Sequence, residues 1–238
     1  MVMASRVGVP ADVAESMSVT PMLASTKKSD ILVLAEQGAL RQYRRGTYIF
    51  HQGDHAPEVH FLWKGRIEIS SDSVTGHRQL HTTLEPPQFF GELGVLGGGP
   101  RTATAVALEE SAVLAIEGEA WLEFLAAHPE ASRALLSALA RQIQAHEAFV
   151  EDLLFLDLKG RVAKRLLQLV SPSLDELPKD GAVVPSVVTH ADLASLSGGS
   201  RENVTRILSE FQRRGLVTRD DRRYVLKNIN GLRRLAAL

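Results

Sequence analysis

The chain of 238 residues contains no cysteine. This absence excludes disulfide bonds, zinc sites built on thiolates, iron–sulfur clusters and cysteine nucleophiles. Aromatic residues are also scarce, at 5%, whereas hydrophobic residues make up 45% and charged residues 23%, which fits an ordinary globular protein. The length is sufficient for one large domain or two small ones.

Long apolar segments are lacking as well. No run approaches the roughly 18 apolar residues that a membrane-spanning helix needs, and residues 1–11 have no continuous apolar core of the kind that signal peptides carry. We therefore expect a cytoplasmic protein with no membrane partner. Paired catalytic carboxylates and nucleophile–base arrangements do not stand out either, so the sequence does not indicate an enzyme.

Histidines are grouped in two places, the first with His51, His55 and His60 and the second with His77 and His81. A metal ion needs ligands that converge on one point. These histidines fall in predicted strands and turns and have no obvious carboxylate partner. We therefore predict no metal site.

The net charge of −1 conceals an uneven distribution. Residues 1–158 carry 12 Lys and Arg against 20 Asp and Glu, a net of −8, whereas residues 159–238 carry 15 against 8, a net of +7. A basic domain attached to an acidic one favours a nucleic-acid partner for the basic part. An unevenly charged solvated surface would give the same numbers, so charge alone leaves both interpretations open.

Residues 39–114 contain short apolar runs separated by glycines. The glycines recur at positions 46, 53, 65, 76 and 91. Strands are predicted at residues 48–50, 60–63, 66–69, 80–83 and 105–116. Short strands at even spacing with glycine turns are typical of a β-barrel or sandwich. Before them, residues 1–22 have two prolines and no sustained period, which predicts a flexible arm.

Residues 119–170 have a helical pattern that is interrupted at Pro129. Beyond this break, six residues follow the alternating three- and four-residue spacing of a coiled-coil seam: Leu136, Leu139, Ile143, His146, Val150 and Leu153. The seam favours dimerisation over a helix that packs only on its own barrel. Lys159 and Gly160 then predict a hinge, because glycine relaxes the backbone within an otherwise helical run.

The segment after this hinge has the pattern of a helix-turn-helix. Thr189 caps a short helix over residues 191–196, with an acidic residue three positions further on. A tight turn at residues 197–199 leads to a second helix over residues 201–213, which Ser200 caps. Apolar positions on both helices can pack them together.

The second helix carries polar residues in its first two turns: Arg201, Glu202, Asn203 and Arg206. In a helix-turn-helix, these N-terminal residues face base edges, where arginine can pair with guanine and glutamate can accept from cytosine. Two short strands, 216–218 and 224–226, flank a charged turn and predict a wing whose Arg222 and Arg223 can meet phosphates. An αα-hairpin with a charged surface is the alternative.

A second motif lies near the end of the strand-rich segment. The sequence FGELGV, residues 90–95, is followed after five residues by Arg101-Thr102-Ala103. Glycine lets the backbone approach a ligand closely. Glu92 can accept a hydrogen bond from a ribose hydroxyl, and Arg101 and Thr102 can donate to a phosphate. A structural salt bridge between Glu92 and Arg101 is the alternative.

Three of these segments resemble one known family. The FGELGV…RTA motif resembles the phosphate-binding cassette of cyclic-nucleotide-binding domains. Residues 200–206, SRENVTR, look like the recognition helix of the catabolite activator (cyclic-AMP receptor) protein / fumarate–nitrate reductase regulator family, and residues 155–163, FLDLKGRVA, are similar to its hinge. The likeness covers about residues 22–236 in the order that the family has.

The resemblance implies an α+β homodimer of four parts. These are a flexible N-terminal arm (1–21), an N-terminal β-roll, or double-stranded jelly roll, that binds a cyclic nucleotide (22–128), a long dimerisation helix with a hinge (129–158) and a C-terminal winged helix-turn-helix (159–238). It implies a transcription regulator, not an enzyme. Its partners would be double-stranded DNA with twofold-symmetric TGTGA-like half-sites, and RNA polymerase.

The resemblance also assigns residues to each ligand. The nucleotide contacts are Gly91, Glu92, Leu93, Arg101 and Thr102, with Glu92 on the ribose 2′-hydroxyl and Arg101 and Thr102 on the cyclic phosphate. The DNA contacts are Thr189, Ser200, Arg201, Glu202, Asn203, Arg206 and Arg222. Of these, Arg201, Glu202 and Arg206 would read bases, and Thr189 and Ser200 would hold phosphates.

The chain departs from the family where a cyclic-AMP receptor has a Thr-Ser pair on its long helix, because it has His146 and Glu147 there. A carboxylate can accept from two adjacent N–H groups of guanine, whereas adenine presents only its amino group on that edge. The family implies cAMP as the effector, and Glu147 makes cGMP or cyclic di-GMP an alternative. The two residues could instead satisfy polar contacts at the dimer interface.

Two further departures concern Pro86-Pro87, where relatives have a Gly-Asp turn, and Asn203, at a position where the family often has threonine. The first affects the shape of the loop before the cassette, and the second affects preference at one base step. A constitutive DNA-binding regulator with a non-functional pocket remains the alternative function. A nucleotide-sensing module that regulates an enzyme would lack specific affinity for DNA, and the winged helix argues against it.

Overall fold

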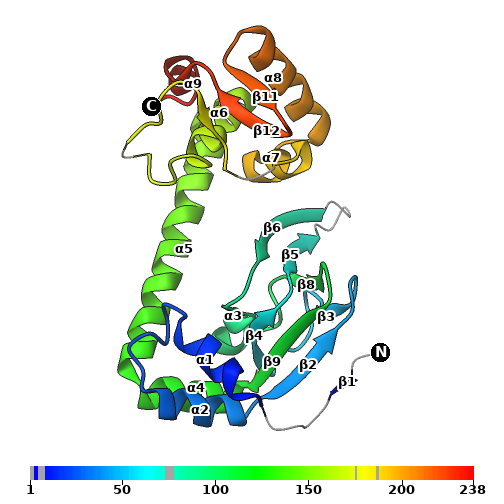
Figure 1. Ribbon diagram of the computed structural model, residues 1–238, viewed down its shortest axis with the longest axis vertical. Helices are drawn as coiled ribbons and strands as arrows, with labels where there is room; N and C mark the ends of the chain where they lie inside the picture. Colours follow the sequence, from blue (N-terminus) through cyan, green and yellow to red (C-terminus); the bar gives the residue numbers. More distant parts are fainter. Residues whose placement is uncertain (1–2, 5–8, 73–77, 175, 186–187) are drawn as a thin grey trace. The chain divides into compact units, whose positions relative to one another are not determined.

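The computed structural model describes residues 3–4, 9–72, 78–174, 176–185 and 188–238. It divides into two compact units, which we call unit 1 (Met1–Arg141) and unit 2 (Gln142–Leu238). The boundary lies inside the longest described helix, α5 (Pro129–Phe155) (Figure 1). Each unit has its own hydrophobic core. No helix among the described residues is long and apolar enough to cross a membrane.

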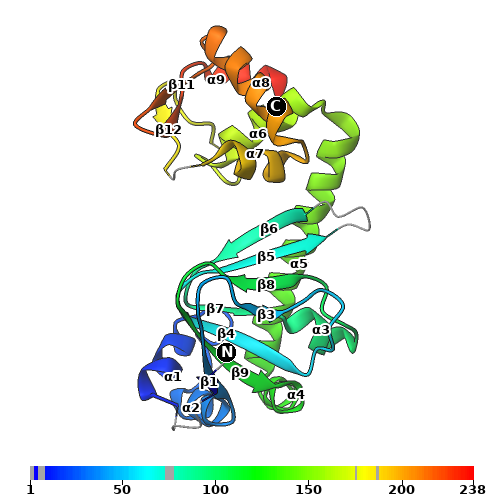
Figure 2. The ribbon, with the colours of Figure 1, turned by 90° about the vertical axis from the view of Figure 1, so that its right-hand side faces the viewer.

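Unit 1 is the predicted β-roll. In the described residues, one sheet has the order β1-β2-β9-β4-β7 and the other β3-β8-β5-β6 (Figure 2), and neighbouring strands are antiparallel. The strands are β1 (Met3–Ala4), β2 (Ala39–Tyr43), β3 (Tyr48–Phe50), β4 (Glu58–Lys64), β5 (Ile67–Asp72), β6 (Arg78–Leu84), β7 (Gln88–Phe90), β8 (Thr104–Ala107) and β9 (Ser111–Glu117).

The apolar stretch predicted as strand at residues 105–116 forms two strands in different sheets. β8 pairs with β3 and β5, whereas β9 pairs with β2 and β4. Between them the backbone N–H of Leu108 donates to the carbonyl of Arg66 at 2.8 Å. Glu109 and Glu110 interrupt the apolar stretch at the point where the chain crosses from one sheet to the other.

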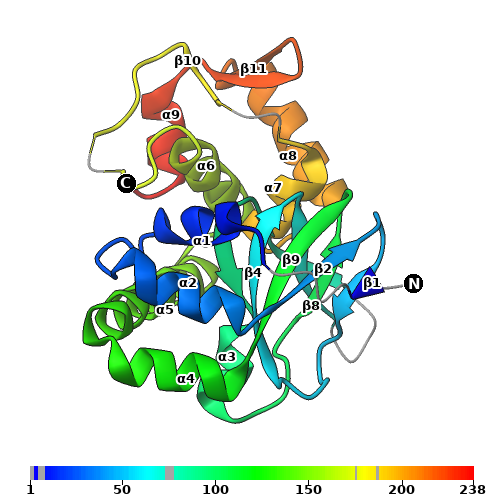
Figure 3. The same cartoon turned by 60° about the horizontal axis from the view of Figure 1, so that its bottom comes forward.

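Strand β4 shows how the core of unit 1 is built. Successive side chains of a strand point to opposite faces. Val59 and Phe61 join the cluster that includes helix residues, while Leu62 joins the cluster between the sheets. Helices α1, α2 and α4 lie against the first sheet (Figure 3). The helices of unit 1 other than α5 are α1 (Ala11–Ser18), α2 (Lys28–Glu36), α3 (Glu92–Gly97) and α4 (Gly118–Ala127).

Part of the predicted N-terminal arm is ordered structure. Helix α1 places Val13 and Met17, four residues apart on one face, in the core against α2 and β4. Strand β1 pairs with β2 through Met3 and Ala4. Residues 1–2 and 5–8 of that arm lie outside the described residues. The flexible-arm prediction is therefore wrong for residues 11–18, whose buried side chains fix the helix.

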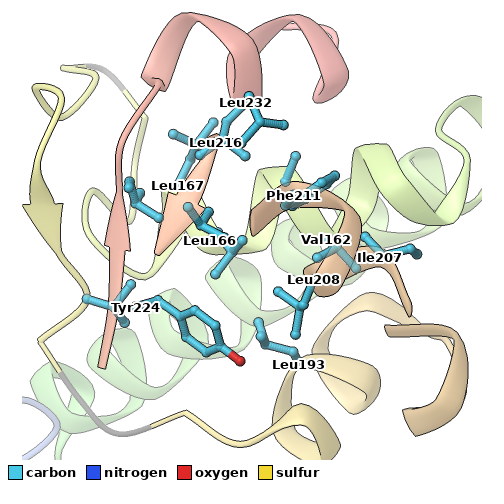
Figure 4. Packing of buried hydrophobic residues seen from close by; sticks show 14 of the residues in the cluster. Val162, Leu166, Leu167, Leu193, Ile207, Leu208, Phe211, Leu216, Tyr224 and Leu232 are labelled. Carbon is cyan, nitrogen blue, oxygen red and sulfur yellow. The ribbon is translucent and has the colours of Figure 1, made fainter. Parts of the chain in front are cut away.

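Unit 2 contains a helix-turn-helix and a wing around one core. Figure 4 shows Val162 and Leu166 on α6, Leu208 and Phe211 on α8, and Tyr224 on β12 packed together. The strands have the order β10-β12-β11. The remaining elements are α6 (Leu158–Gln168), β10 (Ala182–Val183), α7 (His190–Ser197), α8 (Arg201–Arg213), β11 (Val217–Asp220), β12 (Arg223–Leu226) and α9 (Ile229–Leu235).

The break between α5 and α6 lies earlier than Lys159-Gly160. Asp157 caps α6, and its Oδ1 accepts from the backbone N–H of Gly160 at 2.8 Å. Gly160 is buried inside α6, where a Cβ atom would lie 2.7 Å from the carbonyl oxygen of Leu235. The glycine therefore permits close packing of α6 on α9, and the hinge predicted at this glycine is wrong in position.

Candidate nucleotide and DNA sites

The cassette begins where β7 ends. Gly91 has a φ of +78°, in the left-handed region, and is the N-cap of α3. A Cβ atom here would lie 2.6 Å from Nη1 of Arg101. Both the backbone conformation and the close approach of Arg101 therefore require glycine at this position.

The side chain of Arg101 connects the cassette to β4 of the first sheet. Its side chain is only 3% exposed, its Nη1 donates to the carbonyl of Gly91 at 2.7 Å, and its Nη2 donates to the carbonyl of Glu58 at 2.7 Å. The guanidinium also lies 4.2 Å from the ring centroid of Phe50. Burial lowers the pKa of Arg101, against the opposing effect of nearby carboxylates. Arg101 thus ties the glycine turn to β4.

The buried charge of Arg101 suits an anionic ligand. Its Nε is buried without a hydrogen-bond partner, and no ion pair joins it to Glu92 or another carboxylate among the described residues. The Glu58 carboxylate is bound instead by Arg41, whose Nη1 lies 2.7 Å from Oε2. The alternative interpretation, a structural Glu92–Arg101 salt bridge, therefore has no counterpart among the described residues, and the unpaired donor fits a phosphate group.

The other cassette residues differ in exposure. Glu92 is half-buried, and burial raises the pKa of its carboxyl group, although its own backbone N–H and the charge of Arg101 act in the opposite direction. Leu93 and Thr102 are exposed. A carboxylate beside a buried cation can accept from a sugar hydroxyl while the cation binds a phosphate, as the sequence predicts.

Helix α8 separates its core residues from its polar ones. Its apolar face is buried through Val204, Ile207, Leu208 and Phe211. Arg201, Glu202 and Arg206 are exposed, and the side chain of Arg206 donates to the side-chain oxygen of the half-buried Asn203. The hydroxyl oxygen of Ser200, the N-cap, accepts from the backbone N–H of Asn203 at 3.3 Å. The base-facing residues named from the sequence therefore share the outward side of one helix.

Helix α7, which precedes the recognition helix, is held at both ends. Thr189 and Asp192 form a complete capping box at the start of α7, as predicted. At its end, Nε of Arg161 donates to the carbonyl of Ser197 at 2.7 Å, and Nε of Arg165 donates to the carbonyl of Leu196 at 2.9 Å. Two arginines of α6 thus satisfy carbonyls that the helix end leaves free.

The predicted wing is present as a hairpin of β11 and β12. Its register pairs Asp220 with Arg223, so the turn consists of two residues, Asp221 and Arg222. Both have positive φ angles, +39° and +72°, as in a type I′ turn. Arg222 is exposed at the tip.

No cluster of three or more potential metal ligands occurs in the part of the chain that the structure describes. His60 is a buried residue of β4, and His51 and His55 are exposed. Two residues used in the sequence interpretation, Gly76 and His77, lie outside the described residues.

Comparison with known families and proteins accounts for both units. The Cyclic nucleotide-binding domain family matches residues 40–128, and the Crp-like helix-turn-helix domain family matches residues 160–235. The chain is 31% identical over 209 residues to the "CRP-like cAMP-activated global transcriptional regulator" of Mycobacterium tuberculosis, an alignment that covers 87% of this chain and 92% of that protein. This chain belongs to the CRP family, the cyclic-AMP receptor protein family of transcription regulators.

Other CRP-family proteins agree with this assignment. The "Cyclic AMP receptor protein" of Thermus thermophilus is 31% identical over 177 residues, which cover 74% of this chain and 78% of that protein. The crystal structure of the Thermus thermophilus Catabolite Activator Protein matches with a TM-score of 0.55 and 26% identity, and covers 92% of this chain and 99% of that one. The predicted fold is thereby confirmed, as is the prediction of a transcription regulator in place of an enzyme.

Within this CRP-family chain, the two residues predicted to contact the base fall in a different compact unit from the cassette. His146 and Glu147 are exposed on α5 and belong to unit 2, whereas the cassette belongs to unit 1. Gly91 and Arg101 are in direct contact. The sugar and phosphate assignments thus have a described local site, and the base assignment stays a prediction.

Sequence reasoning missed a residue beside the cassette. His60 is 2% exposed, and its ring lies 5.4 Å from that of Phe50 and 5.2 Å from that of Phe90. Burial, with the charges of Arg101 and Arg41, lowers the pKa of His60 from 6.5 to about 3. The sequence grouped His60 with metal-binding candidates, and only its place among the apolar residues of β4 indicated burial.

Sequence reasoning also missed two residues beside the recognition helix. His190 and Arg219 line a pocket of about 460 Å³ together with Thr189, Ala191 and Arg201. The pocket joins residues from α7, α8 and β11. His190 directly follows the cap residue Thr189, which was the signal that its side chain would lie at the same end of α7.

Proposed function

We propose that the chain is a homodimeric, sequence-specific DNA-binding regulator that a cyclic nucleotide controls. The observation that carries this proposal is the outward face of α8, where Arg201, Glu202 and Arg206 are exposed on a helix that is fixed by its cap and core. Such a helix fits the major groove, where its first turns meet base edges. Arg222 at the wing tip and the hydroxyls of Thr189 and Ser200 would hold phosphates, and the Thr189 hydroxyl would turn toward the phosphate from Asp192, to which it donates in the free chain.

The cyclic nucleotide would bind at the cassette of unit 1. The buried Arg101, with its unpartnered Nε, would hold the cyclic phosphate together with Thr102, and Glu92 would hold the ribose. The relatives named for cAMP support that nucleotide as the first candidate. Glu147 keeps cGMP and cyclic di-GMP as alternatives, because its carboxylate can accept from guanine.

A constitutive regulator is the second candidate. Arg101 already donates to two backbone carbonyls, and this arrangement holds the cassette together without any ligand. In that case DNA binding would be independent of every cyclic nucleotide.

Binding measurements on the full chain separate these candidates. We expect calorimetry to show saturable heat with at least one of cAMP, cGMP and cyclic di-GMP, and we expect that ligand to tighten binding to a TGTGA-N6-TCACA duplex at a fixed salt concentration. A scrambled duplex of the same composition is the control. Specific DNA binding without heat from any nucleotide would favour the constitutive regulator, and binding that does not discriminate between the duplexes would contradict the proposal.

The dimer would form along α5. Leu136, Ile143 and Val150 of the predicted seam are 66%, 59% and 52% exposed, so one chain leaves this apolar stripe facing solvent. Burial of such side chains stabilises an association by about 1.5–3 kcal/mol each. A twofold dimer would set two recognition helices about 34 Å apart, one turn of DNA, on symmetric half-sites. The same proposal includes RNA polymerase as a partner, the cytoplasm as the location and the four domain ranges given above.

Charge placed on the seam should separate the subunits. We expect Ile143→Glu/Val150→Glu to raise the dissociation constant of the dimer about a hundredfold or more, because apolar contact is lost and like charges face each other across the twofold axis. Sedimentation velocity measures the change. Gln144→Glu/Glu151→Gln, at exposed positions of α5 beside the seam residues, is the matched control. A monomeric wild type, or a double variant as dimeric as the control, would exclude this interface.

A further inference from the structure

The pocket between α7, α8 and β11 contains a titratable group among fixed charges. His190 is half-buried there, and Arg201 of α8 and Arg219 of β11 line the same pocket. The acidic residue nearest in sequence, Asp192, accepts from the backbone N–H and the hydroxyl of Thr189, both at 2.8 Å. The pocket is therefore electropositive, and it lies beside the helix that the proposed function assigns to DNA.

The hydrogen bonds around His190 fix which ring nitrogen carries the proton. The hydroxyl of Thr205 lies 2.7 Å from the carbonyl oxygen of Arg201, and only the hydroxyl of that pair can donate. A hydroxyl has one proton, so Thr205 Oγ1 can only accept in its second contact, at 2.8 Å from Nδ1 of His190. Nδ1 of His190 is therefore the donor, and the neutral ring has a bare lone pair on Nε2.

Nε2 of His190 has no hydrogen-bond partner among the residues that the structure describes. A phosphate oxygen is only an acceptor, so it is repelled by the lone pair of the neutral ring and attracted by the Nε2–H of the protonated ring. Arg201 and Arg219 attract the phosphate in either state. Contact with the backbone of DNA at this pocket thus favours the doubly protonated form of His190.

We propose that His190 couples DNA binding to proton uptake, with one proton taken up per subunit as a backbone phosphate enters the pocket between α7, α8 and β11. The inference rests on the proposed function, because that function places DNA against α8. Burial and the charges of Arg219 and Arg201 lower the pKa of His190 in the free protein, and a bound phosphate acts in the opposite direction.

The sign of the effect follows from these two states. Below the pKa of the free protein His190 is protonated with or without DNA, and affinity does not change with pH. As pH rises from that value through the higher pKa of the complex, affinity falls, because binding then requires a proton from solution. Two subunits contribute, so the loss of affinity per pH unit can reach at most about a hundredfold.

Fluorescence anisotropy of a labelled duplex, titrated with the full chain at constant ionic strength from pH 5.5 to 8.5, tests this inference. We expect wild-type affinity to fall at least tenfold over this range. His190→Gln keeps a donor toward Thr205 but cannot titrate, so its DNA affinity should not change with pH and should equal the affinity of the wild type at high pH. His190→Arg should be flat near the level of low pH, and the control His55→Gln, at an exposed position of unit 1, should follow the wild type.

A scrambled duplex separates this inference from the proposed function, since a phosphate contact carries no sequence information. A pH dependence that appears with both duplexes and disappears in His190→Gln supports the inference. If neither duplex is preferred, that lack of preference contradicts the proposed function and leaves the inference supported. A flat wild-type curve would overturn the inference, as would equal slopes for wild type and His190→Gln.

Discussion

Acidification from pH 7 to pH 5 should destabilise unit 1 by about 2 kcal/mol through His60 alone. Its ring packs beside those of Phe50 and Phe90, and the charges of Arg101 and Arg41 oppose a further positive charge. The Glu58 carboxylate lies 3.8 Å from Nε2 of His60 but is already paired with Arg41, so protonation in the folded state places a poorly compensated cation beside apolar rings. Unfolding releases the ring to water, where it takes up the proton at its ordinary pKa.

The sign of the effect is set by the depressed pKa. His60 has a pKa of about 3 in the folded chain and 6.5 when unfolded, so between these values the unfolded state binds one more proton. Stability rises with pH across that window, is complete above pH 6.5, and is lost progressively as pH falls toward 3. Arg101 holds the cassette in this region, so acid should weaken nucleotide binding together with stability.

Urea unfolding at pH 5, 6 and 7 measures this effect. The chain has two tryptophans, Trp63 and Trp121, and both are in unit 1, so their fluorescence reports this unit. His60→Phe should reduce the difference in the free energy of unfolding between pH 5 and pH 7 by about 2 kcal/mol. His60→Gln should reduce it by the same amount, although this smaller, polar side chain lowers the stability at every pH. His55→Gln should leave it unchanged. Equal pH dependence in the wild type and both His60 variants would show that this histidine is not the cause.

Local signals explain why the DNA-binding unit was predictable from the sequence. The cap at Thr189, the glycine turn at residues 197–199 and the cap at Ser200 each act within a few residues, so they mark the ends of α7 and α8 in the sequence itself. The apolar period of α8 then determines which side packs inward. Exposure of Arg201 and Arg206 follows from that period.

Features that depend on distant contacts were not predictable in the same way. Gly160 was interpreted as a hinge because glycine is flexible, but the nearby carbonyl of Leu235, 75 positions along the chain, gives it a packing role. Likewise, Arg101 binds the carbonyl of Glu58, which no sequence spacing indicated. The charge state of His60 depends on rings from strands of both sheets, Phe50 of β3 and Phe90 of β7, and on two arginines, so it emerges only from the assembled β-roll.

Replacement of Arg201 by alanine should abolish most of the sequence preference. A bidentate arginine–guanine pair discriminates against the wrong base by about 1–3 kcal/mol. In a twofold complex each substitution removes two such pairs, so we expect a loss of about 2–6 kcal/mol in the preference for a TGTGA-N6-TCACA duplex over one with the guanines replaced. Competition binding at one salt concentration measures this ratio.

Two control variants distinguish base reading from simple loss of charge. Arg213, in the last turn of the same helix, is exposed, and Arg213→Ala removes the same charge far from the base-facing end. Arg222→Ala removes a phosphate contact at the wing tip. Both variants should weaken binding to the two duplexes equally or not at all. Arg222→Ala should also reduce the slope of log binding constant against log salt concentration by about one unit per subunit, because one phosphate contact is lost. A preference that survives in Arg201→Ala would move base recognition to Glu202 and Arg206, the other exposed residues in the first two turns of α8.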